Sequence, residues 1–328
     1  MKFFLDFLKL IRFPNLIIIG LTQYAIRLGI IYPFLRQANL DLFIPEKLFG
    51  LLVLATILIA ASGYIINDYF DIKLDLLNKP KQLIIGKSIS RRQAMFLHLT
   101  INIIGLSLAA YVALSIKHPM LILFQVISAA LLWFYSVSFK KQILIGNLII
   151  AALTALVPFT AGYYEIAVMF DEVKEVGSLE IASYKAQSLR SLLFSIKYLL
   201  YWIIGYSIFA FILTLIREII KDCEDIEGDK AFACKTFPIV YGIQKSKILA
   251  NAITLLLLFL ITILEIVQLF SEDWISLVYF IVLISTPLVW LLFKIKRATK
   301  KKHFFIISQA IKVLMLFGIL YTGIIYLF

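Results

Sequence analysis

Two clusters of acidic side chains stand out in a chain that is otherwise apolar. The first, NDYFDIKLD, runs from Asn67 to Asp75, and the second, REIIKDCEDIEGD, runs from Arg217 to Asp229. Each cluster directly follows a long apolar run. Mg²⁺ prefers oxygen ligands and is commonly held by one or two carboxylates together with the phosphates of a substrate. The residue types therefore indicate two acidic faces that hold metal ions, with a diphosphate bridging them.

Helical spacing would place the oxygen ligands of the first cluster on one face. An α-helix turns by about 100° per residue, so positions four apart are neighbours on its surface. Asn67, Asp71 and Asp75 would lie within roughly 80° of one another, with Asp68 just beyond them. Carboxylates this close repel each other by roughly a few tenths of a kcal/mol per pair, so the spacing favours a bound cation.

The second cluster repeats this pattern with four acids. They would fall within an arc of about 60°, provided that the helix continues past Gly228: Glu218, Asp222, Asp225 and Asp229. One acidic cluster at a helix end is usually a solvated face. Two such clusters beside apolar runs favour a functional site, because ionisable groups near a membrane core are costly and tend to be retained for function.

The composition is that of a membrane protein. Hydrophobic residues make up 62% of the 328 residues and charged residues only 16%, whereas about a quarter of the residues in soluble domains are charged. Spans of about 20 apolar residues cross a bilayer, and only helices or closed barrels satisfy their backbone there. The sequence predicts an all-α, polytopic membrane protein with nine transmembrane helices, at approximately 14–34, 48–66, 95–116, 119–139, 143–169, 198–217, 248–270, 274–293 and 304–328.

The distribution of basic residues predicts the orientation in the membrane. Lys and Arg are concentrated in the N-terminal tail, in 67–94, at Lys140 and Lys141, in 217–247 and in 294–302. By the positive-inside rule, we predict that the N-terminus and both acidic clusters face the cytoplasm. We expect the protein to lie in the cell membrane. The net charge of +12 thus reflects topology, and we expect no nucleic-acid partner. Lys312 is an exception, since it lies inside the last span.

No linker rich in Pro, Gly or Ser divides the chain, so we expect one integral-membrane domain over 1–328. A long span followed by an acidic cluster and a basic loop occurs at 48–94 and again at 198–247. This repetition suggests two related helical halves, about 1–140 and 141–328.

These motifs resemble those of a known family. NDYFDIKLDLLNKP resembles the NDxxDxxxD signature of the UbiA-type intramembrane prenyltransferases, and REIIKDCEDIEGD resembles their second aspartate-rich motif. The similarity extends to IRFPN at 11–15 and to WFYSVSFKKQILIGNLIIA at 133–151. The resemblance implies a nine-helix bundle in which a prenyl diphosphate loses its diphosphate to a lipophilic acceptor, with Mg²⁺ as the cofactor.

The resemblance also implies roles for individual residues. The implied catalytic residues are Asp71, Asp75, Asp225 and Asp229. The implied metal ligands are Asn67, Asp68, Asp71, Asp75, Glu218, Asp222, Asp225 and Asp229. The implied substrate-binding residues are Arg12, Asn15, Asn67, Lys79, Tyr135, Lys140, Asn147, Arg217 and Lys221.

This chain departs from the family pattern at two places. Glu218 stands where the family usually has aspartate, which gives a longer side chain with the same oxygen chemistry. Many relatives read NRPxRP where this chain reads NKPKQLIIG, so Lys79 replaces an arginine and Gln82 replaces the second basic residue. Lysine lacks the bidentate fork of arginine, and Lys140 and Lys141 could supply part of the missing phosphate contact.

Several acceptors and one other class of function fit the sequence. The combination of NDYFD with RExxKDxED looks most like the archaeal-type enzymes that prenylate the free hydroxyl of geranylgeranylglyceryl phosphate, and an aromatic quinone precursor is the alternative acceptor. A carrier of Mg²⁺ or of a polyprenyl phosphate would instead distribute acids such as Glu165 and Glu265 across the membrane. Cys223 and Cys234 are interpreted as incidental thiols, and no obligate protein partner is inferred.

Overall fold

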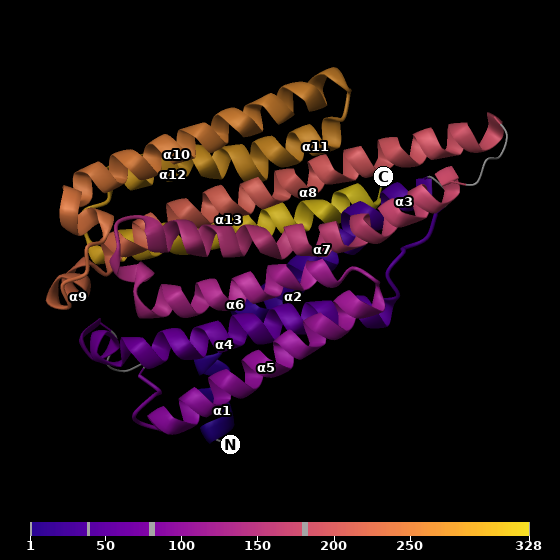
Figure 1. Ribbon diagram of the computed structural model, residues 1–328. Helices are drawn as coiled ribbons and strands as arrows, with labels where there is room; N and C mark the ends of the chain where they lie inside the picture. The colour runs from indigo at the N-terminus through magenta and orange to yellow at the C-terminus, as the bar shows by residue number, and fades with distance from the viewer. Residues whose placement is uncertain (1, 38–39, 79–82, 179–182, 328) are drawn as a thin grey trace.

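The computed structural model is a bundle of long helices that run side by side (Figure 1). It describes residues 2–37, 40–78, 83–178 and 183–327, and it describes only the backbone of residues 2, 74–75, 77–78, 172–178 and 183–195. Every named element in these ranges is helical. The predicted all-α fold class is therefore confirmed.

The elements follow one another with short connections. The N-terminal third contains α1 (Lys2–Leu10), α2 (Phe13–Ile26), the π-helix η1 (Arg27–Ile31), α3 (Tyr32–Gln37), α4 (Glu46–Asn78) and α5 (Arg91–Ser115). The middle contains η2 (Pro119–Leu121), α6 (Ile122–Val137), η3 (Phe139–Lys141), α7 (Ile145–Ser178), α8 (Ser183–Glu224) and α9 (Ile226–Ala231). The C-terminal part contains α10 (Phe237–Phe270), α11 (Trp274–Tyr279), the π-helix η4 (Phe280–Ser285), α12 (Thr286–Arg297) and α13 (Lys301–Leu327).

Nine helical stretches in the described part of the chain are long and apolar enough to cross a membrane, as predicted. Their ends differ from the predicted ones, because a helix continues past the residue at which its apolar run stops. The sixth stretch covers Ile196–Glu224 rather than 198–217, and the seventh covers Phe237–Phe270 rather than 248–270. Each acidic cluster therefore begins within a helix that is long and apolar enough to cross a membrane.

Local sequence signals explain where several helices begin. Ser90 and Gln93 form a capping box at the start of α5: the Ser90 hydroxyl accepts a bond from the Gln93 N–H, and the Gln93 side chain accepts one from the Ser90 N–H. Proline lies in the first turn of several helices, where no N–H is needed, among them Pro14 in α2, Pro238 in α10 and Pro287 in α12.

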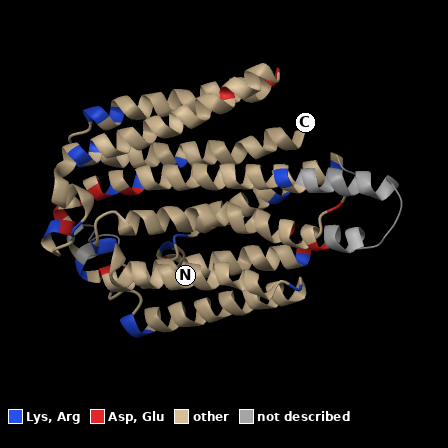
Figure 2. Cartoon of the chain, turned by 45° about the horizontal axis from the view of Figure 1, so that its top comes forward, with Lys and Arg blue, Asp and Glu red and all other residues tan. Residues whose placement is uncertain are grey.

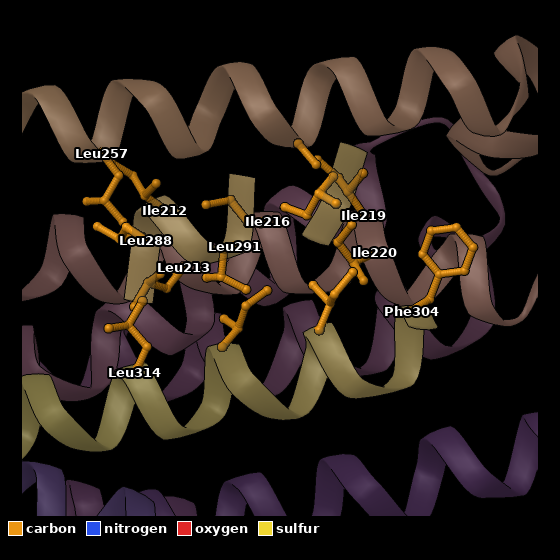
Figure 3. Close-up of a cluster of buried hydrophobic side chains, with 14 of the residues drawn as sticks. Ile212, Leu213, Ile216, Ile219, Ile220, Leu257, Leu288, Leu291, Phe304 and Leu314 are labelled. Carbon is orange, nitrogen blue, oxygen red and sulfur yellow. The ribbon is translucent and has the colours of Figure 1, made fainter. Parts of the chain in front are cut away.

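One apolar cluster fixes the end of α8 that carries the second acidic motif (Figure 3). Buried side chains from α8, α10, α12 and α13 meet there, among them Ile212, Leu213, Ile216, Ile219, Ile220, Leu257, Leu288, Leu291, Phe304 and Leu314. Lipid is as apolar as leucine, so this association depends on close van der Waals packing rather than on exclusion of water. The packing fixes which face of α8 points away from it.

A buried ion pair between Glu165 of α7 and Arg27 of η1 connects these two helices. Glu165 is fully buried and accepts hydrogen bonds from the backbone N–H groups of Phe43, at 2.5 Å, and Ile44, at 3.0 Å. Arg27 lies 3.7 Å from the Glu165 carboxylate, donates to the Ile44 carbonyl and covers the Phe49 ring at 4.2 Å. Glu165 thus holds the segment that precedes α4.

Candidate active site

Charged residues gather at the ends of the bundle, and the middles of the helices are almost free of them (Figure 2). The C-terminal part of α4 carries the first acidic cluster, and the end of α8 with α9 carries the second. The helices α4 and α9 contact each other. The two clusters, which lie more than a hundred residues apart in sequence, are therefore at the same end of the molecule.

Asp71 of the first cluster contacts a lysine from the loop between α6 and α7. The Lys140 ammonium lies 2.5 Å from the Asp71 carboxylate, and both side chains are largely buried. The short helix η3 carries Lys140, and Gly146 at the start of α7 allows η3 to approach closely, because a Cβ on Gly146 would lie 2.8 Å from the Lys140 Cα. Both residues come from the segment that resembles the family.

Arg12 reaches the same cluster from the N-terminal side. Its guanidinium donates to Asp68 at 2.8 Å and lies 4.7 Å from the centre of the Tyr64 ring, one turn earlier on α4. The Asn15 amide donates to the Tyr64 hydroxyl at 3.3 Å. Arg12 has a φ of 52°, in the left-handed region that non-glycine residues rarely adopt, at the junction of α1 and α2. This junction turns Arg12 and Asn15 toward α4.

The second cluster begins on a charged face of α8. At about 100° per residue, Arg217, Lys221 and the acids beside them point roughly opposite to the apolar face that packs in Figure 3. Arg217 donates to Glu218 at 2.5 Å, and the Lys221 ammonium lies 3.9 Å from Glu218. The amide of Asn147, on α7, donates to Asp222 at 2.8 Å. The structure thus brings Asn147, Arg217 and Lys221 to this cluster.

One expectation about this cluster is wrong. The predicted arc of about 60° required one helix to continue past Gly228, but α8 ends at Glu224 and the chain bends at Asp225 before α9 begins. The backbone of Asp225, with φ −96° and ψ 9°, departs from ideal helix geometry. Because α9 also packs against α4, the bend carries Asp229 toward the first cluster.

The ionisation of Asp229 is influenced by both clusters. Burial, together with the carboxylates of Asp225 and Asp71, raises the pKa of Asp229 to about 6, while Lys221 and Lys140 oppose this rise. Asp71 belongs to the first cluster and Asp229 to the second, so carboxylates from both lie within electrostatic range. Such crowding of anions favours a cation between them.

Tyr135 interacts with groups from both clusters. Its hydroxyl interacts electrostatically with Glu218, Asp222, Asp71 and Arg12, which come from three different segments. Tyr135 therefore marks the place where the first cluster, the second cluster and the N-terminal segment meet.

The residues present fit Mg²⁺ bound together with a phosphorylated ligand. Within the described ranges, no three Asp, Glu, His or Cys side chains form a ready-made metal cage. Mg²⁺ does not need one, because it retains water and takes one or two carboxylates with substrate phosphates. The Asn67 side-chain oxygen is buried and has no hydrogen-bond partner in the described structure, so it is an available oxygen ligand beside Asp71.

Lys79 and the side chain of Asp75 lie outside the described residues. Cys223 and Cys234 are both buried and unbridged. Sequence reasoning missed Tyr64, which holds both Arg12 and Asn15, although its position one turn before Asp68 was a usable signal.

Comparisons with known proteins identify the family and the fold of this chain. The UbiA prenyltransferase family matches this chain over residues 36–318. A digeranylgeranylglyceryl phosphate synthase of Methanobrevibacter smithii is 33% identical over 238 residues, covering 71% of this chain and 72% of that protein. The protein of the same name from Saccharolobus solfataricus is 33% identical over 253 residues, covering 77% and 74%.

Solved structures share the fold. One of a digeranylgeranylglyceryl phosphate synthase aligns with a TM-score of 0.60 and 23% identity, covering 99% of both chains. A UbiA homolog from Archaeoglobus fulgidus bound to GPP and Mg²⁺ aligns with a TM-score of 0.55 and 16% identity, covering 95% of this chain and 98% of that one. Since the family description spans most of the chain and two relatives match over more than two thirds of it, this multi-pass membrane protein belongs to the UbiA prenyltransferase family.

Proposed function

We propose that this prenyltransferase moves a geranylgeranyl group from its diphosphate to the free hydroxyl of geranylgeranylglyceryl phosphate. The reaction would depend on Mg²⁺ and take place on the cytoplasmic side of the cell membrane. The observation that carries the proposal is the approach of Asp71, held by Lys140, to Asp229 at one end of the bundle. The names of the relatives support the choice of donor and acceptor.

The two clusters would hold the donor by its diphosphate. The proposed metal ligands are Asn67, Asp68, Asp71 and Asp75 on α4, together with Glu218, Asp222, Asp225 and Asp229 on α8 and α9. When bound, Mg²⁺ supplies Lewis-acid stabilisation of the negative charge on the departing diphosphate. Lys140 adds a fixed positive charge beside Asp71, where it can also reach a phosphate oxygen.

The transfer itself needs little further chemistry from the protein. The bond between the allylic carbon and the diphosphate oxygen breaks, and the electron pair leaves with the diphosphate. A lone pair of the acceptor hydroxyl forms the new carbon–oxygen bond, and the hydroxyl proton passes to a carboxylate or to water. Tyr135 interacts electrostatically with groups of both clusters, and its ring face could stabilise developing positive charge on the prenyl carbon.

The experiment measures transfer in membranes that contain the full-length protein. Labelled geranylgeranyl diphosphate is offered with geranylgeranylglyceryl phosphate or with an aromatic quinone precursor, in separate reactions. We expect label in the ether lipid, loss of product with EDTA and recovery with Mg²⁺. Label only in the aromatic product would assign the other acceptor.

Substitutions test whether the paired clusters form the site. We expect Asp71→Asn and Asp229→Asn each to abolish transfer, because a metal ligand is lost while the packing is kept. Glu227→Gln is the matched control, since Glu227 is an exposed acid on α9 beside Asp229. Full activity of Asp71→Asn and Asp229→Asn would remove the site. Movement of Mg²⁺ across liposomes without any release of diphosphate would favour a carrier.

A further inference from the structure

A group of cations meets around Glu218, apart from the contact between Lys140 and Asp71. Arg217 and Lys221 lie 2.5 and 3.9 Å from the Glu218 carboxylate. Arg12 and Lys312 also act electrostatically on Glu218. Lys312 in turn interacts with Arg217, Lys221 and Arg12. Four positive side chains from α8, α13 and the N-terminal segment therefore share one neighbourhood.

The packing of α13 on α8 places Lys312 beside this group. Its neighbour Ile311 and nearby Leu314 are buried in the same cluster as Ile216 and Ile220 of α8, which flank Arg217 in sequence (Figure 3). Ser308, one helical turn before Lys312, is also buried. Lys312 thus lies on the part of α13 that faces the bundle and at the level of Arg217.

Lys312 lies well inside a membrane-spanning helix. It is 11 residues after Lys301, the first residue of the ninth candidate span, which corresponds to roughly 16 Å along the helix axis. A lysine near a helix end can extend its side chain to the membrane surface, but half-buried Lys312 is far from that end. An ionisable residue at such depth is costly and generally serves a function.

Lys312 has more cations than acids around it. Arg217, Lys221 and Arg12 all act electrostatically on Lys312, against the carboxylate of Glu218. Lys221 and Arg12 have further carboxylate partners, because Lys221 also interacts with Asp222 and Arg12 donates to Asp68. The Nε atom of Arg217 is buried and has no hydrogen-bond partner in the described structure. A doubly charged anion would balance the excess positive charge and accept a bond from this nitrogen.

We propose that Lys312, together with Arg12, Arg217 and Lys221, binds a phosphomonoester on the acceptor lipid and so selects phosphorylated acceptors. This inference deepens the proposed function and rests on it for the identity of the acceptor. The subsite adjoins the reaction centre, because Tyr135 interacts with both Asp71 and Glu218. In geranylgeranylglyceryl phosphate, the phosphate and the reacting hydroxyl are on neighbouring carbons, which suits this closeness.

The test measures binding and kinetics of the purified full-length protein. Equilibrium binding is measured for geranylgeranylglyceryl phosphate, for the same lipid without its phosphate and for inorganic phosphate. The variants are Lys312→Met, which removes the charge and keeps the chain, and Lys312→Arg, which keeps the charge. Lys302→Met is the matched control, because Lys302 is an exposed lysine at the start of the same helix.

We expect Lys312→Met to weaken binding of the phosphorylated lipid about 10-fold or more, as charge-assisted hydrogen bonds of this kind imply. Binding of the lipid without phosphate should not change, and inorganic phosphate should compete only weakly. The KM for the acceptor should rise while the KM for the prenyl diphosphate stays the same. Lys312→Arg should restore most of the affinity, and Lys302→Met should behave as the unmodified protein does.

Three results would overturn the inference. The first is equal affinity of the unmodified protein for the lipids with and without phosphate. The second is that Lys312→Met and Lys302→Met bind the phosphorylated lipid equally well. The third is that Lys312→Met raises the KM for the donor instead of the KM for the acceptor. The second result leaves the proposed function intact if ether lipid is still made. Conversely, phosphate-dependent lipid binding through Lys312 in a protein that makes no ether lipid would support the inference and reject the proposed reaction.

Discussion

Lys140 and Asp71 form the contact that joins the first acidic cluster to the loop between α6 and α7. The two residues are 69 positions apart in sequence, and each was predicted to belong to the site from its own motif. Their pairing could not be predicted, because it depends on how closely η3 approaches α4. A largely buried ammonium beside a proposed metal ligand is suited to neutralise charge on a bound diphosphate.

Replacing Lys140 by Met tests this role at the level of one charge. We expect the KM for the prenyl diphosphate to rise about 10-fold or more, because a charge-assisted contact to phosphate is lost, while the KM for the acceptor changes little. Steady-state kinetics with each substrate varied in turn measures both values. Lys230→Met, at an exposed lysine of α9, is the control, and equal kinetics in the two variants would exclude a role for Lys140 in donor binding.

Two elements position these charges. The helix α8 carries apolar side chains on one face and Arg217, Glu218 and Lys221 on the other, a separation that follows the helical period. The start of α7 depends instead on a close approach, since a Cβ on Gly146 would lie 2.8 Å from the Lys140 Cα and 3.1 Å from the Phe139 carbonyl oxygen. Both of these atoms belong to backbone, so the neighbour cannot move aside by rotating a side chain.

Gly146→Ala should therefore displace η3 and with it the Lys140 ammonium. We expect catalytic efficiency toward the prenyl diphosphate to fall about 10-fold, since small misplacements of a binding group are costly in catalysis. Gly205→Ala in α8 is the matched control, because a Cβ there meets no atom within 4 Å. Kinetics and thermal unfolding of both variants provide the comparison, and unchanged efficiency in Gly146→Ala would contradict the importance of this contact.

Across the whole molecule, the two ends of the bundle have different roles. Asn147 and Glu165 are on the same helix, α7, and 18 residues separate them, or roughly 27 Å. Asn147 contacts the acidic cluster, whereas Glu165 and Arg27 form a buried pair that holds the segment before α4. One end thus carries the candidate chemistry and the other stabilises the helix arrangement.

Glu165→Leu should lower stability without altering the site. Removing one partner of a buried ion pair leaves the other charge uncompensated and costs about 3–5 kcal/mol, so the midpoint of thermal unfolding should fall by several degrees. Activity per folded molecule should persist at low temperature. The double variant Arg27→Met with Glu165→Leu should recover part of the loss. A severe drop in activity at an unchanged midpoint would contradict this division of roles.

The sequence by itself determined the membrane class, the nine spans and the residues of the two acidic motifs, because hydropathy and helical spacing are local properties of the chain. Only the tertiary structure decided that the chain bends at Asp225 between α8 and α9, that Lys140 contacts Asp71 and that Lys312 lies within electrostatic range of Arg217. These features depend on which helices pack together and at what depth. Residues far apart in sequence meet through such packing, and no periodic pattern within a single helix records it.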